Sequence, residues 1–261
     1  MIPYVNIFGK QISMYLIMTM VGIFVSGPFA IKEAKKRGKD PNEILVILLI
    51  SAIGLFIGGH LLYGITNINV LYKLVIHFNR IKSIKQFIDI FIYIFGGQVF
   101  YGGLIGGLLT ACFYMKKKKC DSKLYFDIGA FTIPLFHFFA RIGCFLSGCC
   151  YGVESHIGFK YKHSIVEIAN GVNRFPIQLV ESLFNLMLFA FMYILYKKEK
   201  LKGCLIYLYL SLYAIARFIF EFFRGDHYRG FLFGLSTSQI ISLLIILFVI
   251  ISLIIKKVKK K

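Results

Sequence analysis

The segment "LYFDIGAFTIPLFHFFARIGCFL" (124–146) decides the fold class. A helix needs about 20 apolar residues to cross the hydrocarbon core of a bilayer, and this segment is long enough. The thirteen residues before Arg141 contain no Asp, Glu, Lys or Arg. A charged side chain inside a membrane span costs several kcal/mol and usually faces a cavity or a partner. The segment therefore predicts a transmembrane helix whose arginine faces protein rather than lipid.

The rest of the chain has the same apolar character. Its 261 residues are 58% hydrophobic, with a mean hydropathy of +0.74, whereas soluble domains contain about 45–50% apolar residues. This composition predicts an all-α polytopic membrane protein that forms a single integral membrane domain over residues 1–261. Seven transmembrane helices are expected, near residues 11–31, 44–64, 98–115, 124–146, 176–196, 203–223 and 236–255.

The net charge of +19 would favour nucleic-acid binding in a soluble protein. Here, well over half of the 31 Lys and Arg residues fall in four clusters, at 32–39, 116–123, 197–202 and 256–261. Two predicted spans separate each cluster from the next, so all four face the same side. Cytoplasmic loops of membrane proteins are enriched in Lys and Arg. We therefore expect an external N-terminus, a cytoplasmic C-terminus and no nucleic-acid partner.

Two connections between the predicted spans are long. Residues 65–97 include "QFIDIFIYIF" (86–95), which is too short to cross a membrane. This segment is expected to form an interfacial or external arm. Residues 147–175 are polar enough to form a small external cap.

Polar residues collect at one depth in six of the predicted spans. The direction of each span places them in the outer half of the membrane. Polar residues scattered over many depths would instead indicate only hydrogen bonds between helices. Arg217 and Glu221 are four residues apart, so they share a helix face and can pair, and Arg224 continues that face. Guanidinium groups bind phosphate with forked donors, which favours a phospholipid site. The glycines of "YGGLIGG" (101–107) permit either close helix packing or close approach of a ligand.

Six motifs carry a family resemblance, in order, over almost the whole chain. They are "QISMYLIMTMVG" (11–22), "FIGGHLLY" (56–63), "FYGGLIGG" (100–107), "ARIGCFLSGCCYG" (140–152), "RFPIQLVES" (174–182) and "ARFIFEFFRGD" (216–226). Together they resemble the bacterial prolipoprotein diacylglyceryl transferases, which are seven-span enzymes of the cytoplasmic membrane. The resemblance therefore implies a location in the bacterial cytoplasmic membrane. The resemblance implies transfer of the diacylglyceryl group of phosphatidylglycerol to the lipobox cysteine of a prolipoprotein. The products are a thioether and glycerol phosphate.

The resemblance and the depth of the polar groups together give the candidate site. Arg141, Arg217, Glu221 and Tyr101 are the predicted catalytic residues. The predicted substrate-binding residues are Tyr15, His60, Gly102, Gly103, Gly143, Cys144, Gly152, Gln178, Glu181 and Arg224. The predicted partners are a phospholipid donor and a prolipoprotein or other acceptor at the outer face. No cofactor and no metal ion are implied.

Five positions depart from the family pattern. His60 stands where the family usually has an arginine. Tyr101 stands where the family has a histidine, and a phenol with a pKa around 10 is a poor base at neutral pH. Cys144 and Ser147 replace two asparagines of the signature, and Cys149 replaces its acidic residue. These changes leave open a second hypothesis, in which the same fold transfers a lipid-derived group to a sugar, polymer or small molecule. A third hypothesis is a lipid-binding or transport protein without chemistry.

Three of the six cysteines, Cys144, Cys149 and Cys150, are expected at the outer face, where disulfides persist. Packing without chemistry is one interpretation, and a disulfide from Cys144 to Cys149 or Cys150 is another. A covalent thiol intermediate or a metal site with His137, His156 or His163 are further alternatives. The Cys-x4-Cys-Cys spacing does not match the usual paired zinc ligands.

Overall fold

The structure is a computed structural model that describes residues 1–76, 83–97, 99–226, 231–232 and 234–258. The chain forms two compact units, and each is described by itself. The first unit comprises Met1–Glu33 and Lys123–Lys261, and the second comprises Ala34–Ser122.

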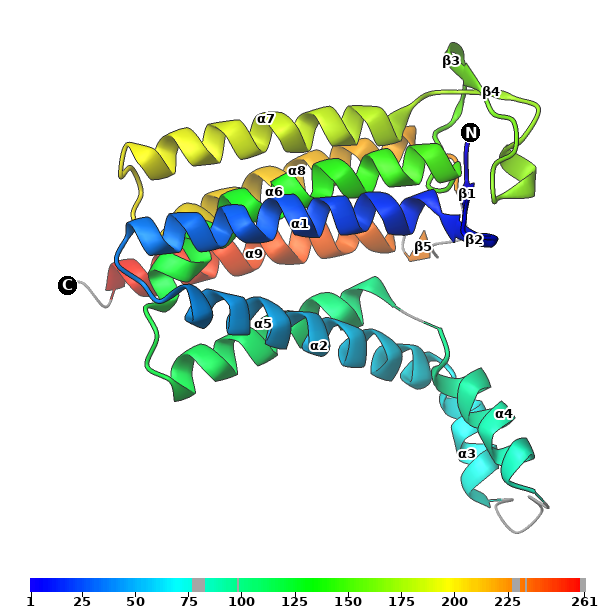
Figure 1. Ribbon diagram of the computed structural model, residues 1–261, viewed down its shortest axis with the longest axis horizontal. Coiled ribbons are helices and arrows are strands. Elements are labelled where there is room, and N and C mark those ends of the chain that lie inside the picture. The colour runs from blue at the N-terminus through cyan, green and yellow to red at the C-terminus, as the bar shows by residue number, and fades with distance from the viewer. Residues whose placement is uncertain (77–82, 98, 227–230, 233, 259–261) are drawn as a thin grey trace. The chain divides into compact units, whose positions relative to one another are not determined.

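The first unit is a bundle of long helices with short strands at one end (Figure 1). Its helices are α1 (Met14–Lys36), α6 (Ser122–Ser147), α7 (Ile177–Lys197), α8 (Leu205–Phe220) and α9 (Thr237–Val258), with 3-10 turns η2 (Glu167–Ala169) and η3 (Glu221–Phe223). Its strands are β1 (Tyr4–Ile7), β2 (Lys10–Ser13), β3 (Glu154–Lys160), β4 (Asn173–Arg174), β5 (Phe231–Leu232) and β6 (Leu235–Ser236). They pair as three antiparallel two-stranded ladders, β1 with β2, β3 with β4 and β5 with β6.

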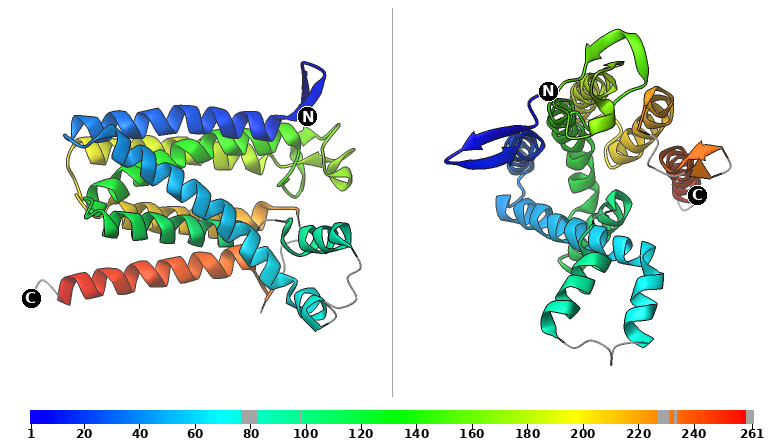
Figure 2. Two further views of the ribbon diagram at one scale, coloured as in Figure 1. Left: turned by 60° about the horizontal axis from the view of Figure 1, so that its bottom comes forward. Right: turned by 90° about the vertical axis from the view of Figure 1, so that its right-hand side faces the viewer.

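The long helices α1, α6, α7, α8 and α9 run side by side, and both views of Figure 2 agree with this arrangement. Basic residues gather at the end opposite the strands. Lys197 Nζ lies 3.0 Å from Glu33 Oε2, which joins α7 to α1. Lys256 Nζ donates to Gly203 O at 3.3 Å, which joins α9 to the start of α8. Lys197 and Lys256, one residue from each of two predicted basic clusters, therefore lie at the same end of the bundle.

Six helices in the described part of the chain are long and apolar enough to cross a membrane, namely α1, α2 (Pro41–Thr66), α6, α7, α8 with η3, and α9. The seventh predicted span is α5 (Phe100–Lys117), an 18-residue helix that contains four glycines and ends in lysines. Large apolar side chains such as Phe24, Phe56 and Phe248 are exposed. Glu33, Gln178 and Ser242 are buried. Apolar groups outside and polar groups inside are expected where lipid surrounds the helices, which confirms an all-α polytopic membrane fold.

The second unit consists of α2, α3 (Ile68–Ile76), α4 (Ile84–Phe95) and α5. Asp40 caps α2 by accepting a hydrogen bond from Asn42 N at 2.9 Å, and Pro41 begins the helix. The predicted arm folds as α3 and α4, of nine and twelve residues, which are both too short to cross a membrane. Residues 77–82 of the arm lie outside the described residues.

Small residues determine the packing of α2 against α5. A Cβ atom added at Gly58 would contact Gly102 O, and one added at Gly106 would contact Gly54 O. Thr110 Oγ1 donates to Ile50 O at 3.1 Å, across the same interface. Small residues four positions apart let membrane helices approach closely. The glycines of "YGGLIGG" therefore have a packing role in this structure.

The cap segment 147–175 contains β3, η2 and β4 around a small core of its own. Tyr151, Tyr161 and Ala169 are buried together. The Arg174 guanidinium lies 4.4 Å from the centre of the Tyr151 ring, which is a cation–π contact. Arg174 Nη2 also donates to Ile168 O at 3.0 Å. The cap is thus a packed structure rather than a loose connection.

We expect Gly106→Val to destabilise the second unit, because the added side chain would collide with the Gly54 carbonyl. Overpacking typically costs about 1–3 kcal/mol. Thermal unfolding of the detergent-solubilised protein would measure this loss. Gly27→Ala in α1 is the matched control, because no atom lies within 4 Å of a Cβ added there. Equal melting temperatures for the two variants would contradict the packing role.

Candidate active site

One carboxylate on α7 lies at the centre of the candidate site. Glu181 is 3% exposed and forms ion pairs with three arginines from different parts of the chain. Arg141 Nε, from α6, lies 2.6 Å from Glu181 Oε2. Arg217 Nη1, from α8, and Arg224 Nη1, from just beyond η3, each lie 3.5 Å from Glu181 Oε1. The predicted convergence of the arginines is therefore present in the first unit, and Glu181 is where they meet.

Two further carboxylates complete the charge balance. Arg217 Nη2 lies 2.5 Å from Glu221 Oε2, so the predicted pairing four residues apart is confirmed. Arg224 binds Asp226 through two parallel hydrogen bonds, Nε to Oδ1 at 2.9 Å and Nη2 to Oδ2 at 2.8 Å. Three guanidinium groups thus face three carboxylates, and the cluster carries no net formal charge when all six are ionised.

Local backbone structure explains why these side chains meet. Helix α8 continues into the 3-10 turn η3, which keeps Glu221 one turn beyond Arg217. Arg224 then adopts an extended conformation and forms an isolated antiparallel bridge with Gly152. A Cβ added at Gly152 would contact Phe175 O. Gly152, predicted as a substrate contact, therefore attaches the cap to the segment that positions Arg224.

The start of α9 supports Arg217. Ser236 caps α9 reciprocally with Gln239: Gln239 N donates to Ser236 Oγ at 3.2 Å, and Ser236 N donates to Gln239 Oε1 at 2.9 Å. This cap fixes the first turn, in which Ser238 Oγ accepts a hydrogen bond from Arg217 Nη2 at 3.0 Å. Arg217 is therefore held by α7, η3 and α9 together.

The three arginines differ in how firmly they are held. The Arg224 side chain is 2% exposed and the Arg217 side chain 11%, whereas that of Arg141 is 20% exposed. The two Nη nitrogens of Arg141 form no hydrogen bond with any described residue. Arg141 therefore has donors left for a ligand, whereas Arg224 is anchored.

Tyr15 and Gly143 lie where α1 meets α6. A Cβ added at Gly143 would lie 3.2 Å from Tyr15 Cα and 3.0 Å from Met18 Cβ, so Gly143 permits close packing of the two helices. Tyr15 is 45% exposed, and it is close enough to Arg141 and Cys144 to interact with them electrostatically. This predicted substrate contact therefore borders the arginine cluster.

Gln178, also predicted as a substrate contact, is fully buried and supports the cap. Its Nε2 donates to Cys149 O at 2.8 Å, and its Oε1 accepts from the Tyr161 hydroxyl at 3.0 Å. Its side chain therefore links α7 to the cysteine turn and to the cap core.

A group of three cysteines, Cys144, Cys149 and Cys150, lies at the same end of the bundle. Their sulfur atoms lie within 4.8 Å of one another, and none of the six cysteines, all of which the structure describes, forms a disulfide. Hydrogen bonds with Cys144 and Cys149 hold the pKa of Cys150 well below its ordinary value. Hydrogen bonds with Cys144 and Cys150 raise the pKa of Cys149.

The remaining predicted residues belong to the second unit. His60 Nδ1 donates to Phe95 O at 2.6 Å, which attaches α4 to α2. Gly102 and Gly103 pack against Gly58 and Leu55 of α2. The side chain of Tyr101 lies outside the described part of the structure. A shared site for these residues and Arg141 therefore stays a prediction.

The sequence interpretation missed several neighbours of the cluster. Asp226 stands in the quoted motif "ARFIFEFFRGD", and Ser238 belongs to a polar run, "STSQ", at the start of the last span. An acidic residue two positions after Arg224 and a polar run at the start of a span could each have indicated a partner for the arginines. His137 is half-buried and feels the charges of Arg141 and Glu181. Its ring also lies 5.5 Å from that of Tyr213.

The fold and the cluster together define a class of protein. It is a multi-pass membrane protein with buried guanidinium groups at the capped end of a helix bundle, a chemistry suited to the phosphate of a lipid. Comparison with known proteins narrows the class, because residues 3–255 match the family described as prolipoprotein diacylglyceryl transferase. The chain belongs to this family of bacterial membrane transferases.

Individual relatives agree with the family match. The chain is 34% identical over 244 residues to the phosphatidylglycerol–prolipoprotein diacylglyceryl transferase of Clostridium tetani, covering 93% of this chain and 92% of the relative. It is 33% identical to the second such enzyme of Clostridium perfringens, with 93% and 90% coverage. Its identity to the Campylobacter hominis enzyme is 31%, with 93% and 86% coverage.

We expect Glu181→Gln to destabilise the protein strongly, because three buried guanidinium groups would lose their shared carboxylate. Breaking a buried ion pair costs about 3–5 kcal/mol. Thermal or denaturant unfolding in detergent would measure the change. Ser182→Ala, in the adjacent position, removes only the hydrogen bond to Phe138 O and should cost about 1 kcal/mol. A Glu181→Gln variant as stable as Ser182→Ala would show that the carboxylate does not hold the cluster together.

Proposed function

We propose that this chain transfers the diacylglyceryl group of phosphatidylglycerol to the lipobox cysteine of prolipoproteins. Membership of the family and the names of its relatives, which describe this transfer, support this function. The structural observation that carries it is the meeting of Arg141, Arg217 and Arg224 on Glu181 at the capped end of the bundle.

Arg141 and Arg217 would bind the donor phosphate. The ester oxygen that leaves with glycerol phosphate gains negative charge in the transition state, and preorganised guanidinium groups stabilise such charge. Because the cluster is already neutral, a bound phosphate must replace a carboxylate contact or take unused donors. The Nη nitrogens of Arg141 are such donors among the described contacts. Glu221 would orient Arg217, whose Nη2 it contacts. Tyr101 is proposed to hydrogen-bond the donor or leaving oxygen.

The prolipoprotein acceptor is favoured over a sugar, polymer or small molecule. The alternative rests on the changed residues at positions 101, 144, 147 and 149. The relatives at 31–34% identity are named for prolipoprotein transfer. A purely lipid-binding role is not favoured, because the roles proposed for Arg217 and Glu221, charge stabilisation and orientation of the arginine, serve a reaction.

The proposed orientation places the arginine cluster in the outer half of the cytoplasmic membrane, with the N-terminus outside and the C-terminus inside. The gathering of Lys197 and Lys256 at the end of the bundle opposite the cap supports it. Basic residues favour the cytoplasmic side. The cap and the cluster would then face the side on which a secreted prolipoprotein arrives.

We expect Arg141→Gln and Arg217→Gln each to lower kcat/KM for transfer at least about 100-fold, because each removes a cationic donor from the developing negative charge. Purified protein would be incubated with phosphatidylglycerol and a lipobox peptide, and both the lipidated peptide and glycerol phosphate would be measured by mass. Lys160→Gln is the control, because it removes an exposed positive charge from the cap. Full activity in both arginine variants would eliminate the mechanism.

The orientation has its own test. A cysteine introduced at His156, exposed in β3, should react with a membrane-impermeant maleimide in intact cells. A cysteine at Lys200, exposed between α7 and α8, should react only after the membrane is opened. Labelling above that of the parent chain would be measured for both. The reverse labelling pattern would show that the protein has the opposite orientation in the membrane.

A further inference from the structure

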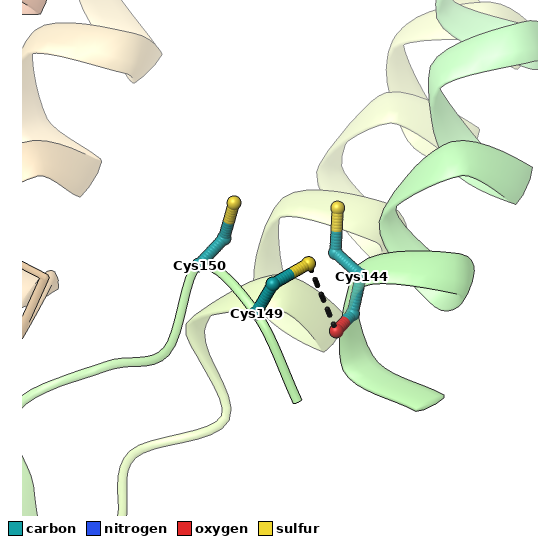
Figure 3. A group of neighbouring side chains, drawn as sticks. All are labelled: Cys144, Cys149 and Cys150. Atoms are coloured by element: carbon teal, nitrogen blue, oxygen red, sulfur yellow. Dashed lines mark hydrogen bonds between the residues drawn. The ribbon is translucent and has the colours of Figure 1, made fainter. Parts of the chain in front are cut away.

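Three thiols, those of Cys144, Cys149 and Cys150, lie together (Figure 3). Cys150 is near enough to Arg224 and Arg141 of the arginine cluster to interact with them electrostatically. Cys144 belongs to the last turn of α6, and Cys149 and Cys150 follow in the turn that leads into the cap. Each offers one sulfur atom, and the three sulfur atoms lie within 4.8 Å of one another. This grouping is the strongest feature of the chain that the donor site leaves unexplained.

The backbone explains how an unusual spacing gives a compact cluster. Gly148 and Cys150 both have left-handed conformations, with φ of 77° and 56°. They turn the chain sharply after α6, so that Cys149 and Cys150 return beside Cys144. The Cys-x4-Cys-Cys spacing, which argues against paired zinc ligands in the sequence, therefore does not prevent three sulfur atoms from meeting.

Hydrogen bonds from other elements hold this turn in place. Ser164 Oγ donates to Gly148 O at 3.0 Å, and Gln178 Nε2 donates to Cys149 O at 2.8 Å. Ile165 N donates to Ser147 O at 3.1 Å. The thiols are therefore positioned by the cap and by α7 rather than by a free loop. Such a preorganised set of ligands favours binding of an ion.

The dimensions and charges suit a soft cation. Zinc–sulfur bonds of about 2.3 Å place tetrahedral sulfur ligands about 3.8 Å apart, which is within reach of the observed cluster after small side-chain rotations. A zinc ion with three thiolates carries a single negative charge. Cys150 feels the positive charges of Arg224 and Arg141, which would offset it.

The three thiols supply only three of the four ligands that a tetrahedral zinc ion needs. Among the described residues, no His, Asp or Glu joins the three cysteines within the same distance. Cys144 is buried, but Cys149 and Cys150 are only half-buried. Three protein ligands with an open fourth position are typical of catalytic rather than structural zinc. The competing explanation is a packed thiol cluster, in which Cys149 Sγ donates to Cys144 O at 3.7 Å.

We propose that Cys144, Cys149 and Cys150 form a three-thiolate site for Zn²⁺, whose fourth position binds the sulfur of the acceptor cysteine. The acceptor role rests on the proposed function, because only that function supplies a thiol acceptor. The zinc site would convert the acceptor cysteine into a thiolate nucleophile. This chain has Tyr101, a poor base, where the family has a histidine. A metal ligand thiol is deprotonated, so no separate protein base is needed to make it reactive.

The reaction balances without an oxidant or reductant. The acceptor S–H releases its proton to water as its sulfur binds the zinc ion. The sulfur then forms a bond to the glycerol carbon of the diacylglyceryl group, while the bond from that carbon to the phosphate oxygen breaks. Glycerol phosphate leaves with the bonding electron pair. The product thioether is a neutral, weaker ligand and can leave the fourth position.

The first test measures the metal directly. Purified protein would be stripped with a chelator and reloaded with Zn²⁺ or Co²⁺, and metal content and Co²⁺ absorption would be recorded. We expect one ion per chain and absorption typical of sulfur coordination. Cys149→Ser and Cys150→Ser should each lower metal affinity at least about tenfold, while Cys112→Ser, at an exposed position outside the cluster, should not. Thermal unfolding of each variant would verify folding. Absence of bound metal, or a disulfide within the cluster, would overturn the proposal.

The second test separates the acceptor role from the proposed function. A lipobox peptide should change the Co²⁺ spectrum, whereas the same peptide with serine in place of cysteine should not. Lipidation should fall at least about tenfold in the metal-free protein and return with Zn²⁺. Equal lipidation with and without metal would overturn the proposal and leave the proposed function standing. Spectral change without any lipidation by the loaded protein would support the thiol site and overturn the proposed function.

Discussion

The ion pairs between Glu181 and three arginines are the interaction on which the rest of the site depends. Guanidinium groups near the hydrocarbon region are costly unless they are paired, and Glu181 pairs with Arg141, Arg217 and Arg224 at once. These contacts join α6, α7, α8 and the segment after η3 at the capped end. Because the arginines are drawn to one carboxylate, helices that are far apart in the sequence present their polar groups at the same place.

The neutrality of this cluster also shapes the chemistry. A site with excess positive charge would hold any anion, whereas a balanced site must exchange contacts to admit a phosphate. Arg224 binds Asp226 through Nε and Nη2 and contacts Glu181 through Nη1, so it is suited to anchoring. Arg141 has a single ion pair, through Nε, and is the most exposed of the three. The structure thus separates a fixed arginine from one that can turn toward a lipid headgroup.

Hydropathy and span direction were enough to predict the helices and the meeting of Arg141, Arg217 and Glu221 in one cluster. They were not enough to predict Glu181 as the centre, because depth along a helix says nothing about which way a side chain faces around its axis. Asp226 was missed for a related reason: it follows Arg224 in extended backbone, where helical spacing no longer relates residues. Gln178 was predicted as a ligand contact because its depth is right, but its hydrogen bonds go to the cap.

Three of the departures from the family pattern lie close together in the first unit, whereas His60 and Tyr101 belong to the second unit. Cys144, Ser147 and Cys149 all lie at the end of α6 or in the turn after it, next to the arginines that keep the family pattern. A joint change from two asparagines and an acid to two thiols and a hydroxyl, with a third thiol at Cys150, changes one face of the site from hard oxygen and nitrogen groups to soft sulfur groups. Such a change leaves the phosphate-binding half intact and alters the half that would meet an acceptor sulfur.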